Sequence, residues 1–331
     1  MTQTTDTPLI VPERSIPAPA SIGAEARAAL GRAAAAGPMQ IAYPPIDDIP
    51  GWQAVAQGMD MGMAGMVARI VGDNAEVADT MTIGDVTCYV AGASPRDGSP
   101  ARVLLDLHGG ALIAGGGTLC GQMAARTARV MDAAVYAPDY RMPPLHPYPT
   151  PLDDCLATYR HLLGQHGADR IVVRGTSAGG NLAAALMLRA VAEGLPLPAG
   201  LILETPELDL TETGDSFQTN MIVDTNLVRG LKPINDLYAG GRDLSDPLLS
   251  PLFGDFTGGF PPTLLTAGTR DLFLSNAVRM LHRLRAAAIP VELLVYEAMP
   301  HGGFFGTPED AVLEADLREF AGRCWSYRAP A

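Results

Sequence analysis

A serine flanked by glycines stands between a predicted strand and a predicted helix, and this arrangement constrains the fold more than any other feature. Residues 170–174 are typical of a short buried strand and residues 180–187 of a helix. The turn between them is Gly175-Thr176-Ser177-Ala178-Gly179. A turn this sharp excludes bulky neighbours and exposes the serine hydroxyl above the positive end of the helix. The pattern predicts either a nucleophilic serine or a serine that only caps the helix.

Strands and helices alternate along most of the chain, which predicts an α/β fold with a mostly parallel central sheet and helices on both faces. The sheet is expected to open with an antiparallel pair over 76–83 and 85–91. The later expected strands are 103–107, 133–137, 171–174, 200–204, 263–267 and 291–296. Further helices are expected over 118–131, 151–163, 276–288 and 308–324. Binding sites in such sheets lie beyond the carboxyl ends of the strands.

The N-terminal part lies outside this alternation. Residues 1–20 are predicted to form a mobile arm, and an alanine-rich helix over 22–36 is predicted to start at a Ser21 cap and to end at Gly37-Pro38. Four methionines follow, at positions 59, 61, 63 and 66. Methionines fill irregular gaps in a core or form adaptable binding surfaces, and both roles are open for this segment.

A second irregular region begins after the strand at 200–204. The stretch 209–246 is polar, with a short helix expected near 226–231, and its place suggests a lid. We therefore divide the chain into four segments. They are an N-terminal arm and cap segment (1–70), the first part of the core (71–208), a second cap segment (209–246) and the second part of the core (247–331).

Composition excludes several classes of function. The formal net charge of −13 argues against binding to nucleic acid or to anionic membrane surfaces. No apolar stretch is long enough for stable membrane insertion, and the N-terminus lacks the basic start and apolar run of an export signal, so a cytoplasmic location is expected. The four cysteines are scattered without a Cys-x-x-Cys pair, which favours buried thiols over a metal or redox site.

A serine hydroxyl becomes a strong nucleophile only when a base removes its proton and an acid holds that base in one tautomer. Of the six histidines, His161, His166 and His282 lie on or beside surface helices, where packing or solvated roles are expected. His301 instead follows the strand 291–296, at the sheet edge that carries the serine turn. We therefore expect His301 to be the base.

The acid has two main candidates. Asp271 follows the strand 263–267 and reaches the same sheet edge, whereas Asp209 lies in the irregular region. We prefer Asp271, because it gives the chain order serine, aspartate, histidine that this type of nucleophile turn requires.

An ester-cleaving or amide-cleaving serine also needs N–H donors aimed at the developing oxyanion. One N–H comes from Ala178, the residue after the serine. Another is expected from the loop His108-Gly109-Gly110-Ala111, which directly follows the strand 103–107. A loop so rich in glycine could also be a simple turn, but its place after a buried strand favours the oxyanion role.

With these elements in place, the chain resembles the hormone-sensitive-lipase family of α/β-hydrolases, the bacterial family IV carboxylesterases, over residues 76–325. The threonine before Ser177 is similar to the Gly-Thr-Ser-Ala-Gly branch of that family. The motifs that carry the resemblance are His108-Gly109-Gly110, Asp139-Tyr140-Arg141, His146-Pro147-Tyr148-Pro149, Gly175 to Gly180, Leu208-Asp209-Leu210-Thr211, Asp271-Leu272 and His301-Gly302.

The resemblance implies an α/β-hydrolase fold with a helical cap and a serine carboxylesterase acting on short- to medium-chain esters through an acyl-enzyme intermediate. It implies Ser177, Asp271 and His301 as the catalytic triad. The implied oxyanion donors are the N–H groups of Gly109, Gly110 and Ala178. Such a mechanism needs no cofactor and no metal. The expected partner is a small-molecule ester substrate, and a homodimer is compatible with the family.

Two departures from the family pattern stand out. Ala111 occupies the last position of the family's His-Gly-Gly-Gly motif, and Leu145 occupies the place of the usual glutamate before the His-Pro pair. Other functions remain open at this point. A lactonase, a deacetylase or an amidase could use the same triad, and a non-catalytic small-molecule binding protein is a rival that the intact triad disfavours.

Overall fold

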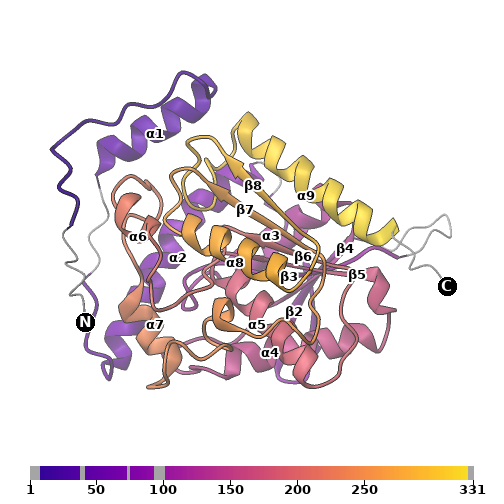
Figure 1. Ribbon diagram of the computed structural model, residues 1–331. Helices are drawn as coiled ribbons and strands as arrows, with labels where there is room; N and C mark the ends of the chain where they lie inside the picture. Colours follow the sequence, from indigo (N-terminus) through magenta and orange to yellow (C-terminus); the bar gives the residue numbers. More distant parts are fainter. Residues whose placement is uncertain (1–7, 38–41, 73–74, 93–100, 327–331) are drawn as a thin grey trace.

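The structure is a computed structural model that describes residues 8–37, 42–72, 75–92 and 101–326. Its centre is an eight-stranded sheet with the order β1-β2-β4-β3-β5-β6-β7-β8 (Figure 1). β2 pairs antiparallel with both β1 and β4, and all other neighbours are parallel. The strands are β1 (Asp79–Ile83), β2 (Val86–Ala91), β3 (Val103–Leu107), β4 (Ala134–Pro138), β5 (Ile171–Thr176), β6 (Gly200–Glu204), β7 (Thr263–Gly268) and β8 (Val291–Tyr296). The predicted sheet, including its opening antiparallel pair, is confirmed.

Helices cover both faces of the sheet, as expected. The helices are α1 (Ala24–Ala36), α2 (Ile49–Val71), α3 (Thr118–Met131), α4 (Thr150–Leu163), α5 (Ala178–Ala192), α6 (Ser216–Thr219), α7 (Lys232–Ala239), α8 (Leu274–Ala286) and α9 (Pro308–Ser326), with two short 3₁₀ turns at Ala168–Arg170 and Pro251–Phe253. One buried cluster joins α4, α5 and α8 to the sheet, and a second joins α3 and α9 to the other face. Along β3, Leu105 belongs to the first cluster and Leu104 to the second, because successive side chains alternate between the faces.

A third buried cluster lies at the carboxyl ends of the parallel strands. It joins Trp52 of α2, Phe217 of α6 and Ile234 of α7 to the glycine loop after β3. Segments far apart in the sequence therefore pack together over one end of the sheet. In Figure 1, their distance in the sequence is seen from their colours, indigo to purple for α2 and orange for α6 and α7.

Two local predictions are wrong. Gly23, not Ser21, precedes α1, and its N–H is bound by the Glu309 carboxylate of α9, so no side chain of the arm caps this helix. The expected helix near 226–231 is a series of turns, and the helix starts at Lys232, where Pro233 fits the first turn. The methionine segment 59–66, for which neither a helix nor a strand was predicted, lies within α2. Residues 1–7 of the predicted arm, and Pro38, lie outside the described residues.

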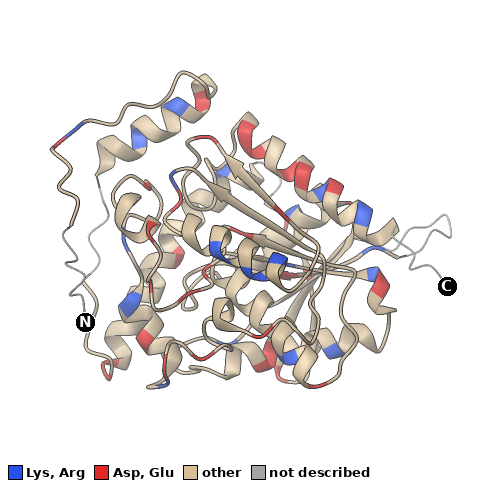
Figure 2. Cartoon of the chain, viewed as in Figure 1, with Lys and Arg blue, Asp and Glu red and all other residues tan. Residues whose placement is uncertain are grey.

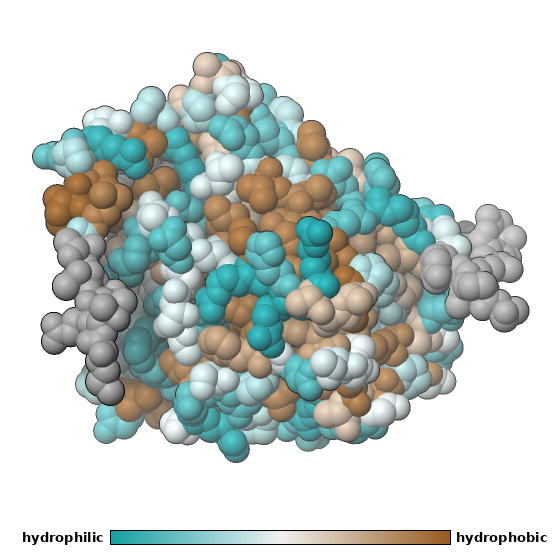
Figure 3. Space-filling view, viewed as in Figure 1, coloured by the Kyte–Doolittle hydropathy of each residue, from teal (hydrophilic) through white to brown (hydrophobic). Residues whose placement is uncertain are grey.

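Charged residues of both signs are interspersed over the outer helices (Figure 2). The exposed apolar residues include Leu9, Ile10 and Val11. Figure 3 shows a brown, apolar group at the left, where Figure 1 places the N-terminal segment. The four cysteines are buried and unpaired, as predicted. Within the described ranges, no helix is both long enough and apolar enough to cross a membrane.

Candidate active site

Ser177 lies on the tight turn between β5 and α5. Its φ of 56° places it in the left-handed region, where a residue other than glycine is strained. A Cβ on Gly175 would lie 2.1 Å from the Gly179 carbonyl oxygen, and a Cβ on Gly179 would lie 2.0 Å from that of Leu107. Both flanking glycines are therefore required by close backbone contact. The Ser177 side chain makes no capping hydrogen bond to α5, which removes the simple helix-cap interpretation.

The structure brings together the three side chains that were predicted from the sequence to form a triad. The distance between Ser177 Oγ and His301 Nε2 is 2.8 Å, and that between His301 Nδ1 and Asp271 Oδ1 is 3.0 Å. His301 follows β8 and Asp271 follows β7, at the same sheet edge as the turn after β5. The Phe273 ring meets His301 edge to face at 4.8 Å. These distances match the geometry in which a base and an acid activate a serine nucleophile.

The surroundings of His301 favour its charged form. Burial lowers the pKa of the imidazole, but the Asp271 carboxylate raises it, and the net effect leaves the pKa of His301 above its usual value. Asp271 is fully buried, and its Oδ1 also accepts a hydrogen bond from the Phe273 N–H at 2.9 Å. The aspartate is thus fixed from two sides, and it holds the proton of His301 on Nδ1.

Asp209, the alternative acid, has a different role. Its carboxylate bonds to the hydroxyls of Thr211 and Thr213 and to Arg279 of α8, one of the basic residues drawn blue on that helix in Figure 2. Burial raises the pKa of Asp209, but these hydrogen bonds lower it further than burial raises it. Asp209 therefore ties the loop after β6 to α8 and makes no contact with His301.

The glycine loop after β3 lies against the nucleophile. A Cβ on Gly109 would be 3.0 Å from the Thr176 carbonyl oxygen and 3.4 Å from Ser177 Cβ. Among the described residues, nothing accepts a hydrogen bond from the N–H groups of Gly109, Gly110 and Ala178. Gly109 and Gly110 line the same cavity as Ser177, and Ala178 directly follows Ser177 in the chain. These free donors are what an oxyanion site needs.

Sequence reasoning missed Asp224, a second carboxylate behind His301. It is fully buried, and its oxygens accept hydrogen bonds from the N–H groups of Asn226, Leu227, Leu272 and His301. Burial and the neighbouring Asp271 raise its pKa to about 6. No motif marks this residue, because its partners come from three separate loops.

Asp224, Asp271 and His301 offer ligand atoms within 4.8 Å of one another, which is metal-like spacing. However, both ring nitrogens of His301 are engaged by Ser177 and Asp271, and N–H donors surround the Asp224 carboxylate. This arrangement fits a proton relay better than a set of metal ligands.

Ser177 and His301 open into a cavity of about 570 Å³. Its roof is a stripe along α2 that includes Met59, Met63 and Met66, whereas Met61 points to solvent and is 73% exposed. The methionines that line the cavity thus form a binding wall, the second of the two roles left open by the sequence. The cavity continues between α3, α9 and the sheet, and its lining includes Leu119, Met123, Val130, Leu313 and Leu317.

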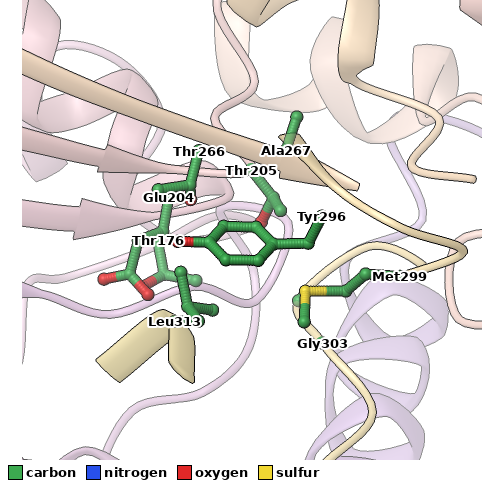
Figure 4. A pocket seen from close by; sticks show the side chains of 10 residues that line it. Thr176, Glu204, Thr205, Thr266, Ala267, Tyr296, Met299, Gly303 and Leu313 are labelled. Carbon is green, nitrogen blue, oxygen red and sulfur yellow. The ribbon is translucent and has the colours of Figure 1, made fainter. Parts of the chain in front are cut away.

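A second, much smaller cavity of about 10 Å³ lies behind the nucleophile turn. Figure 4 shows its side chains, among them Thr176, Thr205, Tyr296 and Glu204. Its volume is about that of one water molecule and excludes a substrate. Glu204 lines both cavities.

The structure shows where the two residues that depart from the family pattern, Leu145 and Ala111, lie. Leu145 is exposed, so no buried carboxylate stands at that place. The support for the turn comes instead from Asn181, whose side-chain amide donates to the carbonyls of Glu207 and Leu249, and from the Glu207 N–H, which donates to the Ser177 carbonyl. Ala111 has a φ of 53° and follows Gly110 without displacing the loop from the cavity.

Comparisons with known proteins agree with this fold. Residues 104–305 match the model of a protein family that is described as having the α/β-hydrolase fold. The chain is 34% identical over 238 residues to an esterase of Acinetobacter venetianus, covering 67% of this chain and 75% of that protein. The crystal structure of an esterase, E25, is similar with a TM-score of 0.83 at 34% identity, covering 95% of this chain and 98% of that one. The crystal structure of EstE7, a hormone-sensitive-lipase homologue from a metagenome library, has a TM-score of 0.71 at 32% identity and covers 86% and 99%.

Proposed function

Because this chain belongs to the hormone-sensitive-lipase family of α/β-hydrolases, we propose that it is a serine carboxylesterase that hydrolyses short- to medium-chain esters through an acyl-enzyme intermediate. The observation that carries this proposal is the hydrogen-bonded line from Ser177 through His301 to the buried Asp271, at the mouth of a largely apolar cavity. The esterases among its relatives support the same reaction.

In the first half-reaction, His301 Nε2 takes the proton of Ser177 Oγ as that oxygen attacks the ester carbonyl carbon. The N–H groups of Gly109, Gly110 and Ala178 bind the carbonyl oxygen as it becomes negative. Asp271 stabilises the imidazolium, which then gives its proton to the leaving alcohol. In the second half-reaction, a water loses a proton to His301 and attacks the acyl carbon, and Ser177 leaves with the proton from His301.

Activity should depend on pH through His301. A protonated imidazole cannot accept the Ser177 proton, so kcat/KM should rise with pH. Because the pKa of His301 is raised, the inflection should lie above pH 6.5. A pH profile of kcat/KM with p-nitrophenyl butyrate measures this.

The profile has an internal control in Glu207, a buried carboxyl whose pKa burial raises to about 8. Below pH 8 this carboxyl is mostly protonated and carries no charge. The variant Glu207→Gln should therefore leave an inflection that lies below pH 8 nearly unchanged. A rate that does not change between pH 6 and pH 9 in the unaltered protein would contradict the assignment of His301 as the base.

Asp224 should act as a positioning residue for His301. The variant Asp224→Asn loses one acceptor of N–H bonds and the negative charge, so we expect kcat/KM to fall about 10- to 100-fold. The inflection of the pH profile should also move to lower pH, because Asp224 contributes to the raised pKa of His301. Asp236→Asn, a half-exposed aspartate of α7, is the matched control and should change neither quantity. If Asp224→Asn lowers only the thermal midpoint, the role is purely structural.

The substrate class is tested with one panel of p-nitrophenyl esters of rising acyl length, together with lactones and anilides. Preferred turnover of short and medium esters supports the carboxylesterase, and preferred turnover of lactones or anilides supports the alternatives. A fluorophosphonate probe separates enzyme from binding protein. Covalent labelling at Ser177 supports the enzyme, and an unlabelled Ser177 in folded protein overturns it.

Several wider expectations remain predictions. The cap is proposed to consist of α2 with α6 and α7, which pack together over the cavity end of the sheet. The Gly-Thr-Ser-Ala-Gly branch, the homodimer and the cytoplasmic location rest on the sequence alone. Light scattering of the purified protein checks the homodimer.

A further inference from the structure

The cavity that starts at Ser177 has apolar helices on one side and charged strands on the other. Its lining positions on α2 run from Gly58 to Ile70, a length of about 18 Å along the helix axis. On the sheet side, Asp106 of β3, Arg174 of β5 and Glu204 of β6 line the same space. A cavity for a plain alkyl chain would have no need of charged groups on its wall.

These three charged residues form one hydrogen-bonded group on adjacent strands. Arg174 donates to Glu204 and donates to Asp106 Oδ1 at 2.7 Å. Their side chains point to the same sheet face, because Asp106 pairs with Arg174 and Arg174 pairs with Ile202, two residues before Glu204. Asp106 is 6% exposed and Glu204 is 7% exposed. We call this set the ionic wall.

The ionic wall offers hydrogen-bond acceptors to the cavity. The only guanidinium of the set is used by both acids, and the second carboxylate oxygens of Asp106 and Glu204 accept no hydrogen bond from the described residues. Because two carboxylates share one guanidinium, the ionic wall has more hydrogen-bond acceptors than donors. Burial raises the pKa of Glu204, in keeping with a shortage of donors around it. Across the cavity, Arg126 is already bonded to Glu314 and to the Ile70 carbonyl.

The depth of the ionic wall follows from the strand. Glu204 is in register with Thr176, next to the nucleophile, whereas Asp106 is in register with Arg174, three residues before Ser177. A strand rises about 3.3 Å per residue, so Asp106 lies about 10 Å along the strand from the nucleophile. An extended covalent chain advances about 3.4 Å for every three bonds, and it therefore reaches Asp106 after about eight bonds.

We propose that the ionic wall is a subsite for a hydrogen-bond donor, in particular a hydroxyl group, on the acyl chain of the ester about eight bonds from the carbonyl carbon. The proposal rests on the proposed esterase function. An unsubstituted chain that covers the wall removes water from Asp106 and Glu204 without replacing its hydrogen bonds, which is unfavourable. A hydroxyl at that position replaces the water and keeps the carboxylates bonded.

The test compares four p-nitrophenyl esters on the intact protein. The butyrate is too short to reach Asp106. The 8-hydroxyoctanoate places a donor there, whereas the nonanoate and the 8-methoxyoctanoate reach as far without one. We expect kcat/KM for the hydroxy ester to exceed that for the methoxy ester and the nonanoate by about 10-fold or more.

A variant tests whether the ionic wall causes the preference for the hydroxy ester. In Asp106→Asn, the ratio of kcat/KM for the hydroxy ester over the methoxy ester should fall at least threefold, because a free carboxylate acceptor is lost. Asp132→Asn, on the exposed end of α3, is the matched control and should keep the ratio. Because the ratio is taken within one variant, a change in stability does not affect it.

The outcomes separate this proposal from the esterase assignment. Normal turnover of the butyrate with equal kcat/KM for the hydroxy and methoxy esters overturns the subsite and leaves the esterase standing. A preference that Asp106→Asn does not alter also overturns the subsite. If none of the four esters is hydrolysed, the esterase assignment and the subsite fail together.

Discussion

Replacing Ser177 with alanine should lower kcat/KM for p-nitrophenyl butyrate by roughly 10⁴-fold or more. The reason is geometric. Ser177 Oγ is the atom that His301 Nε2 contacts at 2.8 Å, and it stands beside the free N–H groups of the glycine loop. Without that oxygen no acyl-enzyme forms, and only oxyanion stabilisation and substrate binding remain. Steady-state kinetics of the purified variant measure the loss, and thermal unfolding shows that the variant is folded.

A buried serine elsewhere provides the matched control. Ser250 is fully buried, and its hydroxyl bonds to the Leu244 carbonyl and the Leu210 N–H. Ser250→Ala should therefore lower the thermal midpoint but keep turnover within about 10-fold, since the hydroxyl serves only packing and hydrogen bonding. If Ser177→Ala retains near-normal turnover, Ser177 is not the nucleophile.

The parts of this fold that could be predicted are those in which local pattern and tertiary role agree. The strands 200–204 and 291–296 and the helix 118–131 were predicted with the bounds that the structure has. Buried parallel strands are continuous apolar runs, and that signal is strong in a single sequence. The chain order of the serine, aspartate and histidine follows from the same strands, because each residue comes directly after one.

The parts that could not be predicted depend on tertiary packing. The helix α2 contains Gly58, Gly62 and Gly65, which weaken its local helix signal. It forms because Trp52 is buried against the glycine loop and because one stripe of methionines faces the cavity. Asp224 belongs to no sequence motif. Its role can be recognised only in the fold, where the loops after β7 and β8 donate hydrogen bonds to it in the segment before α7. The ionic wall is likewise hidden, since its members are 68 and 30 residues from Arg174 in the chain.

Replacing Asp271 with asparagine should lower kcat/KM by about 10⁴-fold. Asp271 Oδ1 accepts a hydrogen bond from the Nδ1–H of His301, at a distance of 3.0 Å. An asparagine can keep the shape, but its amide group donates where the carboxylate accepts. His301 then holds its proton on Nε2 and cannot act as a base toward Ser177. The loss of the carboxylate also removes the charge that raises the pKa of His301, so the residual activity should have its inflection at lower pH.

Asp209→Asn decides whether the acid was correctly chosen. Asp209 is as deeply buried as Asp271, but its partners are Thr211, Thr213 and Arg279. This variant should lose thermal stability, because the Arg279 guanidinium loses its carboxylate partner, and it should keep the pH inflection of the unaltered protein. A much larger loss of turnover in Asp209→Asn than in Asp271→Asn, with both variants folded, would show that Asp209 is the acid. Because Asp271, and not Asp209, bonds to the His301 imidazole, we expect the opposite order.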